Sequence, residues 1–311
     1  IVPVDPVEAP LSLSGHIADL RARAAKPDDP ADAQLAATLL ALMAREDVLS
    51  AQPQRWLGAG GTPTTDEEYT GELTLSPSQF ERALACPLRW FLTTIGADGP
   101  SNAAASLGTL IHAVAEEHPH GTPDELTAAL EARIEELGYN LDTWAGRVAD
   151  RHARDIVNNL ASYLEGIPGP VEVEQTVSAQ VEGVTIRGRM DRLEHVDEGV
   201  RVTDLKTGKS GYSAKTVPDN PQLAAYQMAL LASGERVAGA RIALLGDDKL
   251  KYFDQPRLEG QALEDWHDKL RSVAVDARGP YFEARPSDAA CAYCSFDRLC
   301  PARERGHKVV E

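Results

Sequence analysis

The hydrophobic period of the sequence changes near residue 170, and this change limits the folds open to the chain. In residues 171–181 apolar and polar side chains alternate, as they do in a strand with one buried face. Helical spacing precedes this strand over about 77–91, 101–118, 123–137 and 142–165. After it come expected strands over about 184–196 and 200–206, a helix over 221–231, a strand over 237–245 and a helix over 261–277. This order predicts an α+β fold in which a small mixed sheet is flanked by helices.

A capping box opens the first helix of this region. Ser76 is followed by Pro77 and Gln79, and this order of residues is typical of a helix N-terminus. The helical spacing then continues to about residue 91, which places Cys86 inside a single helix.

Residues 1–72 are expected to form a segment of their own. Prolines punctuate residues 1–10, which indicates an extended start, and a helix is predicted over 32–46 after the Asp29-Pro30 pair. Residues 58–72 combine glycine, proline, threonine and acidic side chains, a composition typical of a linker. We therefore place a domain boundary between residues 72 and 73.

The charge balance bears on the partners that the chain can bind. Its 311 residues include 48 acidic and 31 basic ones, so the net charge is −17, and a net anion is repelled by nucleic acid at long range. Residues 181–215 differ, because seven basic side chains accompany six acidic ones there. An anionic ligand is expected in this stretch of the chain.

No apolar run is long enough to cross a bilayer. The longest, residues 35–44, spans about ten residues, whereas a membrane helix needs about twenty. Residues 1–10 lack the basic start and the apolar stretch of a secretory signal, and the chain begins with Ile1 rather than Met. We therefore expect a cytoplasmic protein without a membrane partner, and a piece of a longer chain.

Asp204, Leu205 and Lys206 end the strand expected over 200–206. Alternation along a strand puts the Asp204 carboxylate and the Lys206 ammonium on one face and Leu205 on the other. A carboxylate that binds a hard cation, beside a lysine that steers a water molecule, suits metal-assisted hydrolysis of a phosphodiester. The alternative is a salt-bridged strand end before a turn.

Two more polar residues precede this tripeptide. Asp191 lies near the middle of the preceding strand, where an aspartate is unfavourable unless it is paired or bound to a metal. A short turn at 197–199 would bring Asp191 next to Asp204. His112 lies in the helix expected over 101–118, where a lone histidine is more often structural than a ligand.

Four short motifs occur in a fixed order: GTLIH at 108–112, GRMD at 188–191, DLKTG at 204–208 and QLAAY at 222–226. Their order, GxxxH, GRxD, DxKTG and QxxxY, resembles the RecB-like branch of the PD-(D/E)XK nuclease superfamily. The order of helices and strands expected above also matches that family's core, so the resemblance implies a restriction-endonuclease-like fold.

The resemblance implies a Mg²⁺- or Mn²⁺-dependent deoxyribonuclease. Its metal ligands would be His112, Asp191, Asp204 and the backbone carbonyl of Leu205. The catalytic residues would be Asp191, Asp204 and Lys206, and Lys206 would position the attacking water. Gln222 and Tyr226, which in isolation would be ordinary surface residues, would hold the DNA strand or support the site.

Three of the four cysteines, Cys291, Cys294 and Cys300, lie close together, whereas Cys86 is far upstream. Four thiolates can hold a zinc ion or a 4Fe-4S cluster, and thiols can also be buried packing residues. One remote cysteine with three clustered ones resembles the iron–sulfur staple of AdnAB- and AddAB-type helicase–nucleases. By that resemblance the four cysteines would hold a 4Fe-4S cluster, with zinc as the alternative.

The resemblance covers residues 73 to about 310. It implies the C-terminal nuclease domain of a bacterial helicase–nuclease that resects DNA ends in double-strand-break repair. Its partners would be DNA, especially single strands, a helicase motor upstream in the same chain and a second helicase–nuclease subunit. Residues 1–72 would be the tail of the motor region with a linker, and a tethered motor would supply strands to the acidic domain. The alternatives are a non-catalytic iron–sulfur module that binds strands and a stand-alone exonuclease of the CRISPR-adaptation type.

Overall fold

The structure is a computed structural model, and it describes residues 12–25, 29–53, 67–97, 107–167, 169–208, 211–292, 294–297 and 299–303. The extended start expected at 1–10, most of the linker expected at 58–72 and the first part of the helix expected over 101–118 lie outside the described residues. The chain forms two compact units, residues 1–67 and 68–311, and this division falls a few residues before the boundary expected after residue 72.

The first unit is a small helical pair. α1 (Leu13–Ala24) and α2 (Pro30–Arg45) pack together with a short 3-10 turn, η1 (Leu49–Ala51). Their shared core contains Ile17, Leu20, Ala36, Leu40 and Ala51. α2 begins close to where the sequence predicts, because the Asp29 side chain caps it. α1 has no counterpart among the predicted helices, since its few buried side chains set no clear period.

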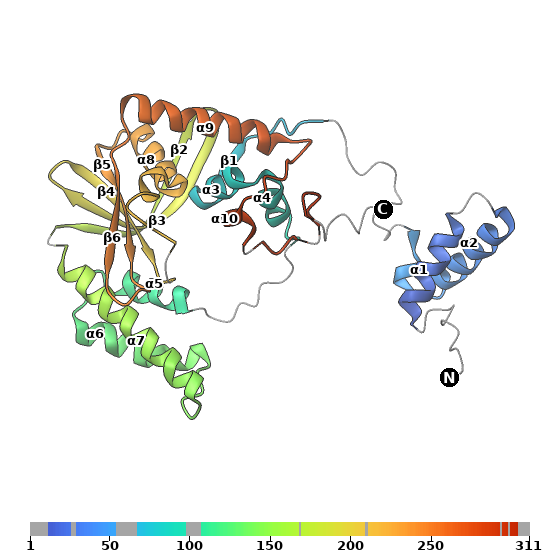
Figure 1. Cartoon of the computed structure of the whole chain (residues 1–311), viewed down its shortest axis with the longest axis horizontal. Coiled ribbons are helices and arrows are strands. Elements are labelled where there is room, and N and C mark those ends of the chain that lie inside the picture. The colour runs from blue at the N-terminus through green and yellow to red at the C-terminus, as the bar shows by residue number, and fades with distance from the viewer. Residues whose placement is uncertain are drawn as a thin grey trace. The chain divides into compact units, whose positions relative to one another are not determined.

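Within the described residues, the second unit is built on one mixed sheet of six strands (Figure 1). The strands are β1 (Leu73–Leu75), β2 (Val171–Val181), β3 (Val184–Val196), β4 (Gly199–Lys206), β5 (Val237–Leu244) and β6 (Lys251–Pro256). β3 pairs antiparallel with β2 and β4, and parallel with β1. β5 lies parallel to β4 and antiparallel to β6.

Helices pack on both faces of this sheet, which confirms the predicted α+β fold (Figure 1). The described helices of the second unit are α3 (Pro77–Ala85), α4 (Pro87–Thr94), α5 (Leu107–Glu117), α6 (Pro123–Arg133), α7 (Trp144–Glu165), α8 (Pro221–Ala232), α9 (Gly260–Arg278) and α10 (Asp288–Cys291), with the 3-10 turns η3 (Ile134–Leu137) and η4 (Val217–Asp219). Val202 of β4 packs with α3, α8 and α9 in one hydrophobic cluster. Leu205 packs with α5, α6 and α7 in another, so β4 presents its two faces to two cores, as strand alternation predicts.

The helix expected over 77–91 is in fact two helices, so the prediction of a single helix that contains Cys86 is wrong. Cys86 lies at the junction of α3 and α4 with an extended backbone, φ −163° and ψ 104°. Pro87 explains the break, because proline has no N–H and disfavours helical backbone at the residue before it.

Three short elements have no counterpart among the predictions. β1 is too short to show a period, β6 lies at the sheet edge and is mostly polar, and α10 is a single turn. Within the described residues, no helix combines the length and the apolarity that a bilayer-spanning segment needs.

Candidate active site and metal centre

The hairpin of β3 and β4 brings two predicted site residues together. The strands pair antiparallel up to Arg192 and Thr203, which lie opposite each other. Asp191 and Asp204 come next in the same register. There the ladder ends, and Asp191 Oδ2 accepts a hydrogen bond of 2.8 Å from the Leu205 N–H. The Asp191 carboxylate therefore lies against the backbone of the strand end that carries Asp204 and Leu205.

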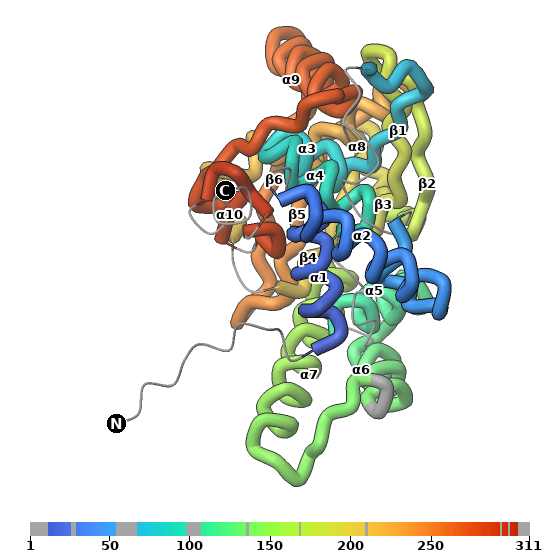
Figure 2. The backbone as a smooth tube through the Cα atoms, turned by 90° about the vertical axis from the view of Figure 1, so that its right-hand side faces the viewer, coloured from blue at the N-terminus to red at the C-terminus, as the bar shows by residue number. Residues whose placement is uncertain are grey.

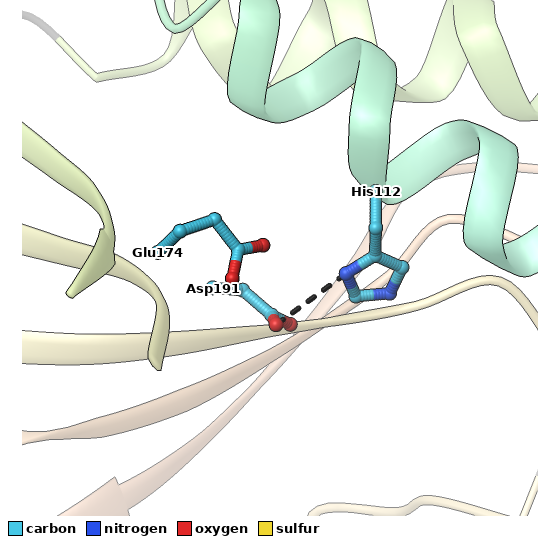
Figure 3. Close-up of side chains that lie close together, drawn as sticks. All are labelled: His112, Glu174 and Asp191. Atoms are coloured by element: carbon cyan, nitrogen blue, oxygen red, sulfur yellow. Dashed lines mark ion pairs between the residues drawn. The ribbon is translucent and has the colours of Figure 1, made fainter. Parts of the chain in front are cut away.

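His112 and Glu174 join Asp191 (Figure 3). His112 projects from α5, and its Nδ1 lies 3.4 Å from Asp191 Oδ1. Glu174, on β2, contributes a carboxylate oxygen to a group whose three candidate ligand atoms lie within 4.8 Å of one another. In the part of the chain that the structure describes, no other three histidine, cysteine, aspartate or glutamate side chains meet that distance. Asp204 thus lies outside this close group.

An open hollow of about 600 Å³ gives access to these side chains. Residues of α5 line one side, and Glu174, Arg189 and Asp191 line the other. Arg189 forms an ion pair with Glu174 on its own side of the hollow and, at 3.0 Å, one with Glu116 of α5 on the other side. The stretch of mixed charge expected to meet an anionic ligand therefore forms part of the hollow's wall.

Asp204, Lys206 and Gln222 contact one another beside this group. Lys206 Nζ lies 2.8 Å from Asp204 Oδ2 and donates to Gln222 Oε1 at 3.1 Å. Gln222 Nε2, from the first turn of α8, donates to Asp204 Oδ1 at 2.8 Å. The side-chain amide of Gln222 therefore holds both Asp204 and Lys206, at the end of β4, in place.

Burial and charge shift the proton affinities of these groups. Burial raises the pKa of Asp204 to about 6, against the opposing effect of the Lys206 ammonium. Burial disfavours the charged form of Lys206 as well, but Asp204, Tyr212 and Asp191 together more than offset this and keep the Lys206 pKa above its usual range. The hydrogen bond to Asp191 raises the pKa of His112. Protons therefore compete with a cation for both Asp204 and His112 near neutral pH.

Tyr226 supports the strand that carries Asp191. Its hydroxyl donates to the Arg189 carbonyl oxygen at 2.7 Å, and its side chain is buried. A Cβ atom at Gly188 would lie 2.6 Å from the Pro77 ring and 3.0 Å from the Tyr226 ring, so glycine is needed for this close approach. Gly188 of the GRMD motif and Tyr226 of the QLAAY motif therefore pack against each other behind the site.

Arg192 fastens α5, the helix of His112, to β3. Its side chain is 1% exposed, and it donates to the Ala115 carbonyl at 3.3 Å and to the Pro119 carbonyl at 2.6 Å. Met190, two positions earlier, packs in the hydrophobic cluster of the other sheet face, so strand alternation breaks at Asp191. This break turns Asp191 and Arg192 toward α5 together.

The donor chemistry fits a hard divalent cation. Asp191 and Asp204 offer carboxylate oxygens, which suit Mg²⁺ or Mn²⁺, and the imidazole nitrogen of His112 makes Mn²⁺ an alternative to Mg²⁺. Asp204 Oδ2 is fully buried, and apart from its ion pair with Lys206 it has no hydrogen bond. A buried anionic oxygen of this kind is stabilised by a bound cation.

The cysteines lie apart from this site. Cys86 is at the α3–α4 junction, Cys291 ends α10, and Cys294 and Cys300 follow it. All four are partly buried free thiols, and among the described residues they form no close three-ligand group. The C-terminal segment nevertheless packs beside α4, since Arg89 Nη1 donates to the Ala290 carbonyl at 2.8 Å (Figures 1 and 2).

Comparison with known proteins places this site in a family. The family model of the PD-(D/E)XK nuclease superfamily matches residues 74–301. The chain therefore belongs to the PD-(D/E)XK nuclease superfamily, and residues 74–301 form a nuclease-type domain. No curated protein matches the sequence.

Solved structures also match the chain. The protein SSO0001 is 18% identical with a TM-score of 0.40, and the match covers 75% of this chain and 88% of that one. A candidate exonuclease from Eubacterium rectale is 12% identical with a TM-score of 0.44, and the match covers 78% of this chain and 93% of that one.

Proposed function

We propose that residues 73–311 are a Mg²⁺- or Mn²⁺-dependent deoxyribonuclease that hydrolyses phosphodiester bonds in single DNA strands. One observation carries the proposal: β3, β4 and α5 converge so that His112, Asp191 and the Asp204–Lys206 pair meet at one end of the sheet. The experiment is incubation of an end-labelled single strand with the whole chain, with Mg²⁺, with Mn²⁺ or with a chelator. Cleavage that needs the cation supports the proposal, and an intact strand under all three conditions would contradict it.

The side chains divide the work of hydrolysis. His112, Asp191, Asp204 and the Leu205 carbonyl would hold the cation, which when bound supplies positive charge at the phosphate. Lys206 stays protonated beside Asp204, so its ammonium can orient a water molecule by donating an N–H hydrogen bond to the oxygen of that water. Gln222 fixes the positions of Lys206 and Asp204, and Tyr226 holds the strand of Asp191 from behind.

The net charge of the chain bears on how a DNA strand would reach the site. A chain with a net charge of −17 is repelled by DNA, so a strand needs to be delivered rather than captured. We place this domain at the end of a DNA-end-resecting helicase–nuclease, with a motor upstream in the same chain, for which residues 1–72 would be the tail, and with a second helicase–nuclease subunit. The order of the four motifs and the cysteine spacing support this assignment to double-strand-break repair in a bacterial cytoplasm.

His112 gives a test of the metal ligands. Replacing His112 with Ala should lower cleavage at low Mn²⁺ and recover part of it at high Mn²⁺, because a lost ligand weakens binding by about 10- to 100-fold without removing the carboxylates. Cleavage rates measured across a Mn²⁺ titration check this. The exposed His120 offers a matched control, and His120→Ala should follow the parent curve. A His112→Ala loss that no Mn²⁺ concentration relieves would return His112 to a structural role.

We further propose that Cys86, Cys291, Cys294 and Cys300 hold a 4Fe-4S cluster, with zinc as the alternative. The packing of α10 against α4 supports this, since it places the C-terminal segment beside the helix that follows Cys86. The described residues between 286 and 303 include few large buried side chains, with Phe296 an exception, so a cluster would be their main attachment.

Protein purified without oxygen should therefore carry about four irons per chain and absorb near 400 nm. Cys291→Ser should lose the iron and lower the melting temperature, whereas Ser295→Ala, an exposed neighbour in the same segment, should retain both. Colourless protein with one zinc per chain would replace the cluster by zinc, and protein with neither metal would make the cysteines packing residues.

A further inference from the structure

Glu174 lies directly opposite Asp191 on the neighbouring strand. The ladder between β2 and β3 keeps one register throughout, with Val173 opposite Arg192 and Gln175 opposite Met190. The position between these two pairs belongs to Glu174 and Asp191, which the ladder leaves unpaired. Their carboxylates lie on the same side, close to each other and to His112 (Figure 3).

The Glu174 and Asp191 carboxylates repel each other unless a positive charge lies between or beside them. Like charges directly opposite each other on neighbouring strands repel and destabilise the pairing. Glu174 is also held with φ at 54°, in the left-handed region that non-glycine residues seldom adopt. An acidic residue in a seldom-adopted backbone conformation, facing a second acid, is the kind of local strain that is concentrated at functional sites.

Arg189 supplies the charge in the structure. Its guanidinium pairs with Glu174 and with Glu116, and its side chain is 56% exposed on the open side of the hollow. The Glu174 side chain, by contrast, is only 14% exposed and lies on the inner side with Asp191. Arg189 is therefore the solvent-exposed partner of the pair and Glu174 the enclosed one.

We infer that Glu174 is a further ligand of the cation that His112 and Asp191 hold, and that Arg189 is its counter-ion when the cation is absent. The inference rests on the proposed metal-dependent function and adds to it a residue outside the four sequence motifs. Cation binding would exchange the Arg189 contact for a metal–oxygen contact. The guanidinium, which keeps its ion pair with Glu116, would then face the hollow, where it can also meet a DNA phosphate.

Two substitutions that break the same ion pair separate this role from a structural one. In the whole chain, Mn²⁺ binding is followed by the loss of the electron paramagnetic resonance signal of free Mn²⁺. Glu174→Gln should weaken binding by at least about 10-fold, because a ligand is lost and even an outer-shell partner is worth about 10- to 100-fold in metal affinity. Arg189→Gln should tighten it, because a competing cation is lost. Glu172→Gln, on the same strand and exposed, should bind as the parent does.

The outcomes decide between the possibilities. Equal Mn²⁺ affinity of Glu174→Gln and the parent, or changes of the same sign in Glu174→Gln and Arg189→Gln, would overturn the ligand role and leave the nuclease proposal standing. Weaker binding by Glu174→Gln in a protein that binds Mn²⁺ but never cuts DNA would support the ligand and contradict the nuclease. A parent that binds no Mn²⁺ would overturn both. Far-ultraviolet circular dichroism of each variant confirms that it is folded.

Discussion

Replacing Asp204 with Asn will reduce DNA cleavage by at least about 100-fold while leaving the melting temperature at pH 7 unchanged or higher. Activity falls because the amide cannot serve as an anionic metal ligand beside Asp191. Stability does not fall, because burial raises the pKa of Asp204 in the folded state to about 6, above its ordinary value. An upward shift for an acid means that its ionised form destabilises the fold at pH 7, and Asn removes that charge at almost constant shape.

Cleavage of a labelled single strand and a thermal melt, measured on the same preparation, check both parts. Asp265→Asn, which alters an exposed carboxylate on α9, is the control and should match the parent in both. Lys206→Met should show a similar loss of cleavage, since it removes the ammonium and retains the stem. An Asp204→Asn variant that cuts DNA at the parental rate would remove the basis for the nuclease proposal.

Replacing Arg192 with Met will have the largest effect on stability, a loss of roughly 2–4 kcal/mol in the free energy of unfolding. The carbonyls of Ala115 and Pro119 lose their donor, and the bond to Ala115 is buried, so its carbonyl loses a partner that water does not readily replace. The methionine side chain retains the apolar contacts of the arginine stem. The change in the free energy of unfolding therefore measures the contribution of the two guanidinium hydrogen bonds. Because α5 carries His112, we expect Mn²⁺ affinity to fall as well, although Arg192 touches none of the candidate ligands through its guanidinium.

Denaturant unfolding and Mn²⁺ titration of the same variant measure the two effects. Arg187→Met changes an exposed arginine on the same strand and should alter neither quantity by more than about 0.5 kcal/mol. If Arg192→Met were destabilised but bound Mn²⁺ normally, α5 would hold its position without this anchor, and the role of Arg192 would be confined to the core.

The sequence predicts the parts of the fold that depend on local chemistry. Alternation identifies β2, β3 and β4, and a short turn between β3 and β4 predicts that Asp191 and Asp204 come together. Capping residues locate the starts of α3 and α8, where Ser76 and Asn220 accept hydrogen bonds from the first turn. In these places one or a few neighbouring residues determine the local structure, so the pattern is visible in the sequence.

The remaining features depend on residues far apart in the chain. Glu174 sits at a polar position of an alternating strand, and only its partner across the ladder distinguishes it from Glu172. The break in alternation at Asp191 has no local signal, because it follows from the contacts of Arg192 with α5. The break between α3 and α4 at Cys86, by contrast, has a local signal in the sequence, because Pro87 directly after it disfavours a continuous helix.

The first elements of the second unit to be synthesised pack against elements that are synthesised much later. β1 and α3 leave the ribosome first, but β1 pairs with β3, and α3 packs against α8 and α9. α4 receives the contact of Arg89 with Ala290, close to the end of the described chain. A nascent chain therefore cannot complete the scaffold around Asp191 and Asp204 until most of the domain has emerged. For the deoxyribonuclease proposed above, a site that forms only after most of the domain has been synthesised would leave the cell without a partly made, uncontrolled nuclease.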